Sequence, residues 1–325
     1  MTATAKLITI LVPAYNEEKN LDRVYDRVRA VTQSLQAQYR YEVILLDNAS
    51  VDDTRAVANR ICDRDPNWKY LRYSRNFGLE ASLLAGLDHS QGDAVVILFS
   101  DLQDPPELIP RMIEIWETGS EVVYGKLNER NDSSLLKTLG AHIAYQMIYH
   151  LSECKIAPGA TDFRLMDRRV VDALTQLREP DRYMRGLVHW VGFKQTPVDY
   201  DRAERQGGSS SANLYYCIKF ALHAMICFSY KPLHLVTLFG LCITAGSFLL
   251  AVAYTILRFL RPTFMEAPPP GITTVFLLLL FVVGSNALFL GIIGEYIGRI
   301  YNQGKHRSLY IVGERKNFES FTPRT

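Results

Sequence analysis

The sequence predicts an α/β domain with a mostly parallel sheet, followed by a helix at a membrane interface and two helices that cross the membrane. In the first 212 residues, strand-like runs alternate with segments of helical spacing, which is typical of a parallel sheet with helices on both faces. Residues 94–99 are apolar throughout, as a central parallel strand is. Two long runs after residue 232 contain no charged residue.

The elements of the α/β domain follow from the spacing of apolar side chains. Strands are expected at residues 7–12, 42–46, 69–73 and 94–99. Helices are expected at residues 20–36, at about 54–61 and at 79–87. Because strands and helices alternate, the strands are expected to run parallel, with their carboxyl ends at the same edge of the sheet.

Polar clusters follow the predicted strands. Because ligands of parallel sheets bind at the carboxyl ends of the strands, we expect the binding site there. The clusters are Tyr15-Asn16-Glu17, Asp47-Asn48, Arg75-Asn76 and Asp101-Leu102-Gln103-Asp104. A dinucleotide site is not expected, since no Gly-x-Gly-x-x-Gly follows the first strand. Residues 119–126 also fail the P-loop pattern, because five residues instead of four separate the glycines.

The two uncharged runs, residues 235–257 and 271–294, are long enough to cross a bilayer. The first has 23 residues, or about 34 Å as a helix, against about 30 Å of hydrocarbon. The segment between them, residues 258–270, is expected to be a short loop with two Lys or Arg residues, whereas the opposite flanks have six. We therefore expect an inner-membrane protein whose N-terminal domain and tail are both cytoplasmic.

Two further segments have the spacing of amphipathic helices. Proximity to the membrane favours a bilayer-surface helix over a core-facing one for residues 214–230, whereas residues 135–151 leave both interpretations open. The chain thus divides into an α/β domain, a juxtamembrane helix, a two-helix membrane domain and a cytoplasmic tail, at residues 1–212, 213–232, 233–298 and 299–325. Four glycines in or just after the second run favour close helix packing, which leaves a homo-oligomer open; they are Gly284, Gly291, Gly294 and Gly298.

Composition excludes several classes of protein. A formal charge of +2, from 36 Lys and Arg against 34 Asp and Glu, is too even for a general nucleic-acid binder. The five cysteines form no Cys-x-x-Cys pair, which excludes a disulfide scaffold and suits a reducing compartment. The first apolar run stops at Pro13 and is too short for a signal peptide.

A candidate metal site lies in the last polar cluster. Asp101 and Gln103 supply oxygen ligands two residues apart at a turn, where both can face one hard cation such as Mg²⁺ or Mn²⁺. Alone, an acidic turn followed by two prolines is more typical of a solvated loop.

Seven segments occur in an order that closely resembles the family 2 glycosyltransferases with a GT-A fold. The first four are Val-Pro-Ala-Tyr-Asn-Glu-Glu (12–18), Asp-Asn-Ala-Ser-Val-Asp-Asp-Thr (47–54), Ser-Arg-Asn-Phe-Gly (74–78) and Ser-Asp-Leu-Gln-Asp-Pro-Pro-Glu (100–107). The others are Thr-Asp-Phe-Arg-Leu-Met (161–166), Arg-x-x-Arg-x-x-Gly (202–208) and Gly-Glu-Tyr-Ile-Gly-Arg-Ile-Tyr (294–301). The set covers nearly the whole chain and is similar to the polyisoprenyl-phosphate glycosyltransferases, the group of bactoprenol glucosyltransferase and dolichol-phosphate mannose synthase.

The resemblance implies that the first strand end and the turn at residues 47–54 hold the nucleotide of a UDP-sugar donor. The implied donor-binding residues are Pro13, Tyr15, Glu17 and Asp47. A carboxylate at Asp47 suits this role because it can accept the imide N–H of uracil; the alternative is a loop Asp that caps the next helix. Arg75 is implied to face the diphosphate or to stabilise the sheet edge, and both remain open.

Several positions depart from the family pattern. Asn48 and Ala49 stand where Asp-Gly is common, and alanine lacks the freedom of glycine to adopt positive φ. In the metal turn, Asp101 and Gln103 match the last two ligands of Asp-x-Asp-x-Gln, but Phe99 replaces the first acid. The implied Mg²⁺ or Mn²⁺ would then bind Asp101, Gln103, water and the donor diphosphate, and would neutralise charge on the leaving group.

The acceptor side is implied by three residues. Asp162 matches the position with an acceptor-side or general-base role, and Arg202 and Arg205 match basic residues over the donor and acceptor phosphates. The alternative for the arginines is cytoplasmic positive charge beside a membrane. Ser211 and Ala212 replace basic and aromatic residues of the pattern, which puts a phosphate contact at residue 211 in doubt.

The sequence therefore predicts a membrane-bound, metal-dependent, inverting glycosyltransferase with catalytic residues Asp101 and Asp162. It would move a sugar, with glucose as the first choice, from a UDP-sugar to a polyisoprenyl phosphate such as undecaprenyl phosphate. GDP-mannose is the alternative donor. A processive polysaccharide synthase would need more membrane helices and a Gln-x-x-Arg-Trp segment. A membrane-anchored scaffold that has lost catalysis is the alternative from another class, favoured by Phe99, Ser211 and Ala212.

Overall fold

A computed structural model of the chain describes residues 5–127, 159–180, 182–201 and 272–318, together with a few positions between 238 and 256. The chain divides into two compact units, Met1–Cys227 with Arg307–Thr325, and Phe228–His306. Several expectations fall outside the described residues: the helices at 135–151 and 214–230, the loop at 258–270, and Arg202, Arg205, Ser211 and Ala212.

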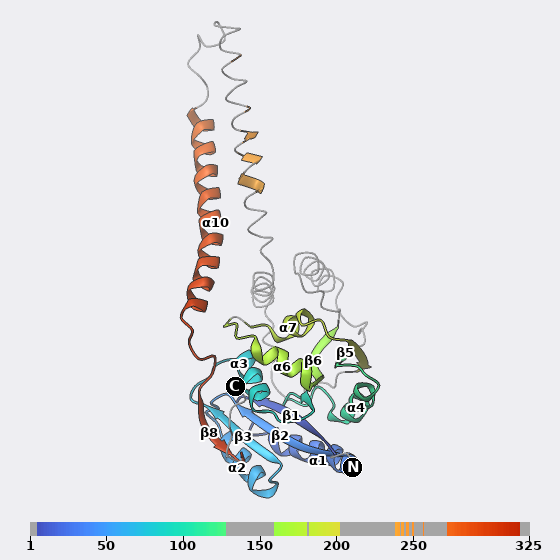
Figure 1. The fold of residues 1–325 in the computed structure, drawn as a ribbon. Coiled ribbons are helices and arrows are strands. Elements are labelled where there is room, and N and C mark those ends of the chain that lie inside the picture. Colours follow the sequence, from blue (N-terminus) through green and yellow to red (C-terminus); the bar gives the residue numbers. More distant parts are fainter. Residues whose placement is uncertain are drawn as a thin grey trace. The chain divides into compact units, whose positions relative to one another are not determined.

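The first unit contains an eight-stranded sheet (Figure 1). Its strands are β1 (Lys6–Ala14), β2 (Tyr39–Asp47), β3 (Trp68–Tyr73), β4 (Ala94–Ile97), β5 (Val122–Leu127), β6 (Ala160–Asp167), β7 (Gln195–Tyr200) and β8 (Val312–Lys316). Their order is β7-β5-β6-β4-β1-β2-β3-β8. The pairs β1–β2, β1–β4, β2–β3 and β5–β7 are parallel, while β3–β8, β4–β6 and β5–β6 are antiparallel. The sheet is thus mostly parallel, as expected.

Helices cover both faces of this sheet. The helices are α1 (Leu21–Leu35), α2 (Thr54–Arg64), α3 (Leu79–His89), a 3₁₀ turn η1 (Pro106–Leu108), α4 (Ile109–Glu117), α6 (Arg168–Gln176) and α7 (Met184–Trp190). The contacts group α1, α2 and α4 together, and α3 packs with α6, which contacts α7. The predicted strands and helices of the first 100 residues are confirmed, although β4 ends two residues earlier than expected.

The centre of the sheet is largely apolar. Leu11 and Val12 of β1 and Ile97 of β4 are completely buried. Helix α3 lies very close to the sheet, because a Cβ built on Gly86 would stand 2.7 Å from Leu46 Cδ1 and 2.9 Å from Leu11 Cδ1. This close packing brings the first turn of α3 to the carboxyl ends of β1 and β2.

The C-terminal segment differs from the separate tail that the sequence suggested. Residues Val312–Lys316 form β8, which pairs antiparallel with β3 at the sheet edge (Figure 1). The side chain of Asn317 donates to the carbonyl groups of Cys62 and Trp68, at 2.8 and 2.7 Å. The hydroxyl of Tyr310 donates to Asp88 at 2.7 Å. The segment is therefore part of the α/β unit.

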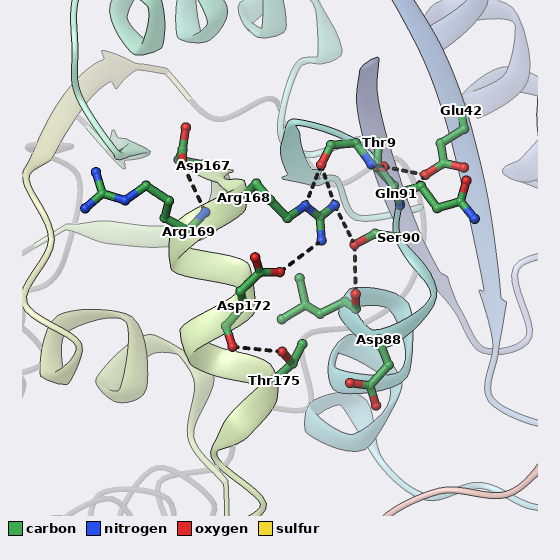
Figure 2. A network of polar contacts seen from close by, with 12 residues as sticks. Thr9, Glu42, Asp88, Ser90, Gln91, Asp167, Arg168, Arg169, Asp172 and Thr175 are labelled. Carbon is green, nitrogen blue, oxygen red and sulfur yellow. Dashed lines mark hydrogen bonds and ion pairs between the residues drawn. The ribbon is translucent and has the colours of Figure 1, made fainter. Parts of the chain in front are cut away.

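A polar network stabilises the sheet at the amino ends of β1, β2 and β4 (Figure 2). The buried carboxylate of Glu42 accepts from Thr9 Oγ1 at 2.5 Å, from Lys69 Nζ at 2.6 Å and from the Gln91 backbone N–H at 2.8 Å. Arg168 donates from Nε to the Gly92 carbonyl at 2.7 Å. Since ligands of parallel sheets bind at the opposite strand ends, this network is structural.

The second unit is built on α10 (Ile272–Gly304), a helix of 33 residues. The rings of Phe239 and Phe289 meet edge-on at 6.0 Å. Across the positions that the structure describes, no helix has both the length and the apolar character that crossing a membrane requires. The two predicted transmembrane helices are therefore not confirmed.

Candidate active site

A pocket of about 360 Å³ opens at the carboxyl ends of β1, β2 and β4. Each of the four polar clusters expected from the sequence contributes to it. The lining residues are Pro13, Ala14, Tyr15, Glu17, Asn48, Asn76, Gly78, Leu79, Ser82, Phe99, Ser100 and Asp101. Of the expected donor-binding residues, Pro13, Tyr15 and Glu17 line the pocket.

The loops after β1 and β2 hold each other in place. The backbone N–H of Asn16 donates to Ser50 Oγ at 2.9 Å, and Asn16 Oδ1 accepts from the Val51 N–H at 2.9 Å. The Glu17 N–H donates to Thr54 Oγ1 at 2.9 Å. Asn16 and Ala49 both have positive φ, at 57° and 60°. The two loops therefore present one fixed surface to a ligand.

Asp47 lies beneath this surface and does not line the pocket. Its carboxylate is 1% exposed, and it accepts from the Ser50 N–H at 2.8 Å and from the Tyr70 hydroxyl at 2.6 Å. Burial, followed by the bond to Asp47, raises the pKa of Tyr70. Arg72 Nε stands 3.8 Å from the same carboxylate. The predicted contact of Asp47 with the uracil base of the donor stays a prediction. The two bonds that Asp47 accepts stabilise the turn after β2.

The next residue, Asn48, does line the pocket. Its Oδ1 accepts from the Phe77 backbone N–H at 2.9 Å, which fixes the amide orientation. Arg75 lies over the Phe77 ring, with its guanidinium carbon 4.0 Å from the ring centroid. Asn76 Oδ1 accepts from the Gly78 N–H at 2.9 Å, where the backbone takes a φ of 89°. The segment Arg75–Gly78 is thus ordered by its own bonds and by Asn48.

The turn at residues 101–103, where the sequence predicts a metal site, is fixed by hydrogen bonds of the residues before and after it. Before it, Ser100 Oγ donates to the Pro13 carbonyl at 3.0 Å. Within it, Asp101 Oδ1 accepts from the Gln103 N–H at 3.2 Å, and Leu102 is 8% exposed with a φ of 53°. After it, the fully buried Asp104 accepts from the Tyr200 hydroxyl of β7. Burial of the Leu102 side chain offsets the cost of its left-handed backbone.

Two oxygen-bearing side chains in this turn fit a hard cation that keeps water or phosphate ligands. Asp101 lines the pocket and Gln103 stands two residues away. Within the described ranges, no three His, Cys, Asp or Glu side chains gather as a metal cluster. Mg²⁺ commonly binds through one or two protein ligands and completes its coordination with water and phosphate oxygens, so two side chains suit it.

Asp162 of β6 lies between two arginines. Arg185 of α7 donates from Nε to Oδ1 at 3.1 Å and from Nη2 to Oδ2 at 2.5 Å. Arg164 Nη2 donates to Oδ1 at 3.0 Å and to the Thr161 carbonyl at 2.9 Å. Arg164 also pairs with Ile97, the last residue of β4, in the antiparallel register of β4 and β6.

Glu80 connects the pocket with this cluster. It follows Leu79 of the pocket, and its Oε2 accepts from the Met184 N–H at 2.8 Å, at the start of α7. Burial raises the pKa of Glu80 to about 7; the bond from Met184 and the arginines Arg182 and Arg164 lower it, while the charge of Asp162 raises it. A carboxyl that titrates near neutrality beside a binding pocket is typical of a functional site.

Residues 9–175 match the family described as glycosyl transferase family 2. The chain is 38% identical over 309 residues to the bactoprenol glucosyl transferase of Shigella phage SfV, covering 95% of this chain and 99% of that protein. It is 37% identical over 312 residues to the uncharacterized glycosyltransferase YkcC of Bacillus subtilis strain 168, covering 96% and 95%. The chain belongs to glycosyl transferase family 2.

Solved structures are less similar to this glycosyltransferase. Mannosyl-3-phosphoglycerate synthase from Rubrobacter xylanophilus is 14% identical with a TM-score of 0.45, covering 83% of this chain and 80% of that one. Glucosyl-3-phosphoglycerate synthase from Mycobacterium tuberculosis, in complex with Mn²⁺, UDP and glucosyl-3-phosphoglycerate, is 19% identical with a TM-score of 0.41, covering 67% and 76%. The GT-A expectation instead agrees with the family and with the α/β sheet of the transferase itself.

Sequence reasoning missed three charged residues of the transferase's site. Arg164 lies two positions after Asp162 on the same strand, and strand periodicity could have placed both on one face. Arg185 and Glu80 come from helices far away in the sequence. No local pattern joins them to Asp162, because the bonds from α7 to Asp162 and to Glu80 form only in the folded chain.

Proposed function

We propose that this family 2 glycosyltransferase moves glucose from UDP-glucose to the phosphate of a polyisoprenyl carrier such as undecaprenyl phosphate. The observation that carries the proposal is its similarity, over nearly the full length of both chains, to a bactoprenol glucosyl transferase. The pocket beside Asp101 supports it, because its polar residues gather at the strand ends where parallel sheets bind ligands.

The chemistry suits a phosphate acceptor. A phosphate monoester has a second pKa of about 6 and is mostly dianionic at pH 7, so its oxygen is already a competent nucleophile. Attack on the sugar C1 from the side opposite the diphosphate forms the new C1–O bond and breaks the bond to the UDP leaving group. The sugar configuration at C1 is thereby inverted. No proton has to be removed from the acceptor in this step.

A divalent cation fits the proposal, with Asp101 and Gln103 as its protein ligands. When bound, Mg²⁺ or Mn²⁺ supplies positive charge to the departing diphosphate. Asp101→Asn should lower transfer at least about 100-fold, and excess chelator should do the same to the wild type. Asp172→Asn, which removes an exposed acid of α6, is the matched control and should have no effect. Full activity in excess chelator would exclude the metal.

We further propose that the uncharged runs at residues 235–257 and 271–294 attach the enzyme to the membrane, with its α/β unit and both termini on the cytoplasmic side. Supporting this is the sequence asymmetry of two Lys or Arg residues in the loop against six in the opposite flanks. Protease treatment of sealed inside-out and right-side-out vesicles tests the orientation. Cleavage of the α/β unit in right-side-out vesicles would contradict it.

A panel of donors tests the proposed reaction. Membranes that contain the enzyme are incubated with undecaprenyl phosphate and radiolabelled UDP-, GDP- or dTDP-sugars, and the lipid is extracted. We expect label in the lipid from UDP-glucose. Label from GDP-mannose instead would identify the alternative donor. UDP binding without any transfer would favour a scaffold that has lost catalysis, for which the apolar Phe99 in the pocket is the supporting observation.

A further inference from the structure

The amino end of α7 receives a hydrogen-bond acceptor from another helix. The first N–H groups of a helix have no acceptor within the helix itself. For α7, the side chain of Glu80 in α3 supplies one, because its Oε2 accepts from the Met184 N–H at 2.8 Å. The two residues are 104 positions apart in the sequence. This bond therefore fixes the start of α7 against the first turn of α3.

The position of α7 depends on a small number of polar contacts. Helix α7 has seven residues, of which Met184 and Leu187 are each 1% exposed. Hydrophobic burial is non-directional, so it does not by itself fix the rotation of so short a helix. Just before α7, Arg182 donates to the carbonyl groups of Leu177 and Leu174 at the end of α6. Arg182 and Glu80 thus fix the entry into α7 from two different helices.

A shift of α7 would move a charged pair of the site. Arg185 follows Met184 directly, and its Nη2 donates to Asp162 Oδ2 at 2.5 Å. Asp162 is the residue for which the sequence predicts an acceptor-side role. The contact between Glu80 and Met184 therefore affects where the Arg185–Asp162 pair lies relative to the pocket at the strand ends.

The wall of the pocket next to Glu80 is fixed by bonds of its own. The Phe77 N–H donates to Asn48 Oδ1 at 2.9 Å, and the Gly78 N–H donates to Asn76 Oδ1 at 2.9 Å. Neither bond involves Glu80. Loss of the contact with Met184 should therefore displace α7 while the pocket keeps its shape.

We propose that Glu80 is a positioning residue, which fixes α7, and with it the Arg185–Asp162 pair, relative to the pocket during sugar transfer. This inference rests on the proposed function, in which the pocket binds the nucleotide-sugar and Asp162 lies on the acceptor side. Glu80 acts through the Met184 N–H. Loss of this contact slows the transfer step and leaves donor binding unchanged.

Four variants of the full chain in nanodiscs separate positioning from simple stabilisation. Glu80→Ala removes the acceptor, whereas Glu80→Gln keeps a carbonyl oxygen that can accept the same N–H. Asp93 is the matched control, because its Oδ2 accepts from the Leu7 N–H at 2.8 Å, at the amino ends of the strands. Asp93→Ala and Asp93→Asn repeat the two changes there. For each variant, kcat and KM for UDP-glucose are measured at saturating undecaprenyl phosphate, UDP binding by calorimetry and the melting temperature by circular dichroism.

The proposal predicts a fall in kcat without a change in donor binding. Glu80→Ala should lower kcat about 10- to 100-fold, because a small displacement of positioned groups is enough to slow transfer by that much. Its KM for UDP-glucose and its affinity for UDP should stay at the wild-type values. Glu80→Gln should restore kcat. Asp93→Ala should lower the melting temperature and leave kcat unchanged.

Glu80→Asp keeps the charge but is one methylene shorter, and it replaces Glu80→Ala if that variant does not fold. The same fall in kcat is expected, since the shorter side chain does not reach the Met184 N–H.

A purely structural role of Glu80 predicts a different pattern. Glu80→Ala or Glu80→Asp would then melt at a lower temperature with an unchanged kcat for the folded enzyme, and the proposal would be wrong. It would also be wrong if Glu80→Gln were as slow as Glu80→Ala, or if UDP binding weakened together with kcat. If the wild type uses another donor, kcat is measured with that donor. If it transfers from none, the proposed function fails, and this inference fails with it.

Discussion

The backbone N–H of Met184 donates to Glu80 Oε2 at 2.8 Å, and this bond joins the start of α7 to the first turn of α3. Immediately before Glu80, Gly78 and Leu79 line the pocket at the strand ends. Immediately after Met184, Arg185 binds Asp162. One carboxyl group thus links the two sides of the site.

Glu80 should make the stability of the enzyme depend on pH. Its pKa is raised in the folded protein from 4.5 to about 7, mainly by burial. A raised pKa means that the contribution of Glu80 to stability is complete below pH 4.5 and is lost as the pH rises to about 7. Glu80→Gln stays neutral and can still accept the Met184 N–H, so it should be more stable than wild type at pH 8, by up to about 3 kcal/mol.

Melting temperatures of the full chain at pH 5 and pH 8 measure this effect. The gain of Glu80→Gln over wild type should be small at pH 5 and clear at pH 8. Glu114→Gln is the control, since Glu114 lies in an exposed ion pair with Arg111, and it should show no such difference. An equal gain of Glu80→Gln at both pH values would contradict the assignment.

Ala49 should be a site where glycine stabilises the protein. Its φ of 60° lies in the left-handed region, which costs a residue with a Cβ about 1–2 kcal/mol. Glycine removes that strain but adds about 0.4–1 kcal/mol of unfolded-chain entropy. Ala49→Gly should therefore stabilise the enzyme by about 0.5–1 kcal/mol. Ala56→Gly, on the exposed side of α2, should instead destabilise it by about 1 kcal/mol. Thermal melting compares the two, and a loss of stability in both would show that Ala49 is not strained.

The sequence predicts those strands whose residues are buried and form a continuous apolar run. Strands β1, β2 and β4 consist largely of apolar residues because they lie at the centre of a parallel sheet. Strand β8 reads Val-Gly-Glu-Arg-Lys and gives no such signal. It is an edge strand, where charged side chains are common because one side faces water.

The candidate site was predictable to the level of the strand end but not of the single residue. The clusters at the ends of β1, β2 and β4 do meet in one pocket. At the end of β2, however, Asp47 turns under the loop to Tyr70, while Asn48 lines the pocket. Neighbouring residues of a strand point to opposite sides, so a shift of one position exchanges a pocket-lining residue for a buried one.

The C-terminal strand changes the expected behaviour of a truncated enzyme. A chain that ends at residue 232 lacks β8 and leaves the backbone groups of β3 unpaired at the sheet edge. We expect it to bind UDP but to transfer poorly to long-chain acceptors. It should also melt several degrees below a chain in which residues 307–325 follow residue 232 through a Gly/Ser linker. Equal melting temperatures for the two chains would show that β8 contributes little to the α/β unit.

Asp162 should position the reactants instead of carrying a proton. Both carboxylate oxygens already accept from arginine, so binding a proton would disrupt the bidentate pair with Arg185. A phosphate acceptor, as proposed, would need no base above pH 7, whereas general-base help to an alcohol is worth about 10²- to 10⁴-fold. Transfer by wild type and by Asp162→Asn is measured from pH 6 to pH 8.5 at saturating lipid. A positioning role predicts a roughly constant ratio of the two rates over this range. If the ratio fell towards unity as the pH rose, the acceptor's own ionisation would be replacing Asp162, and Asp162 would have to be a base.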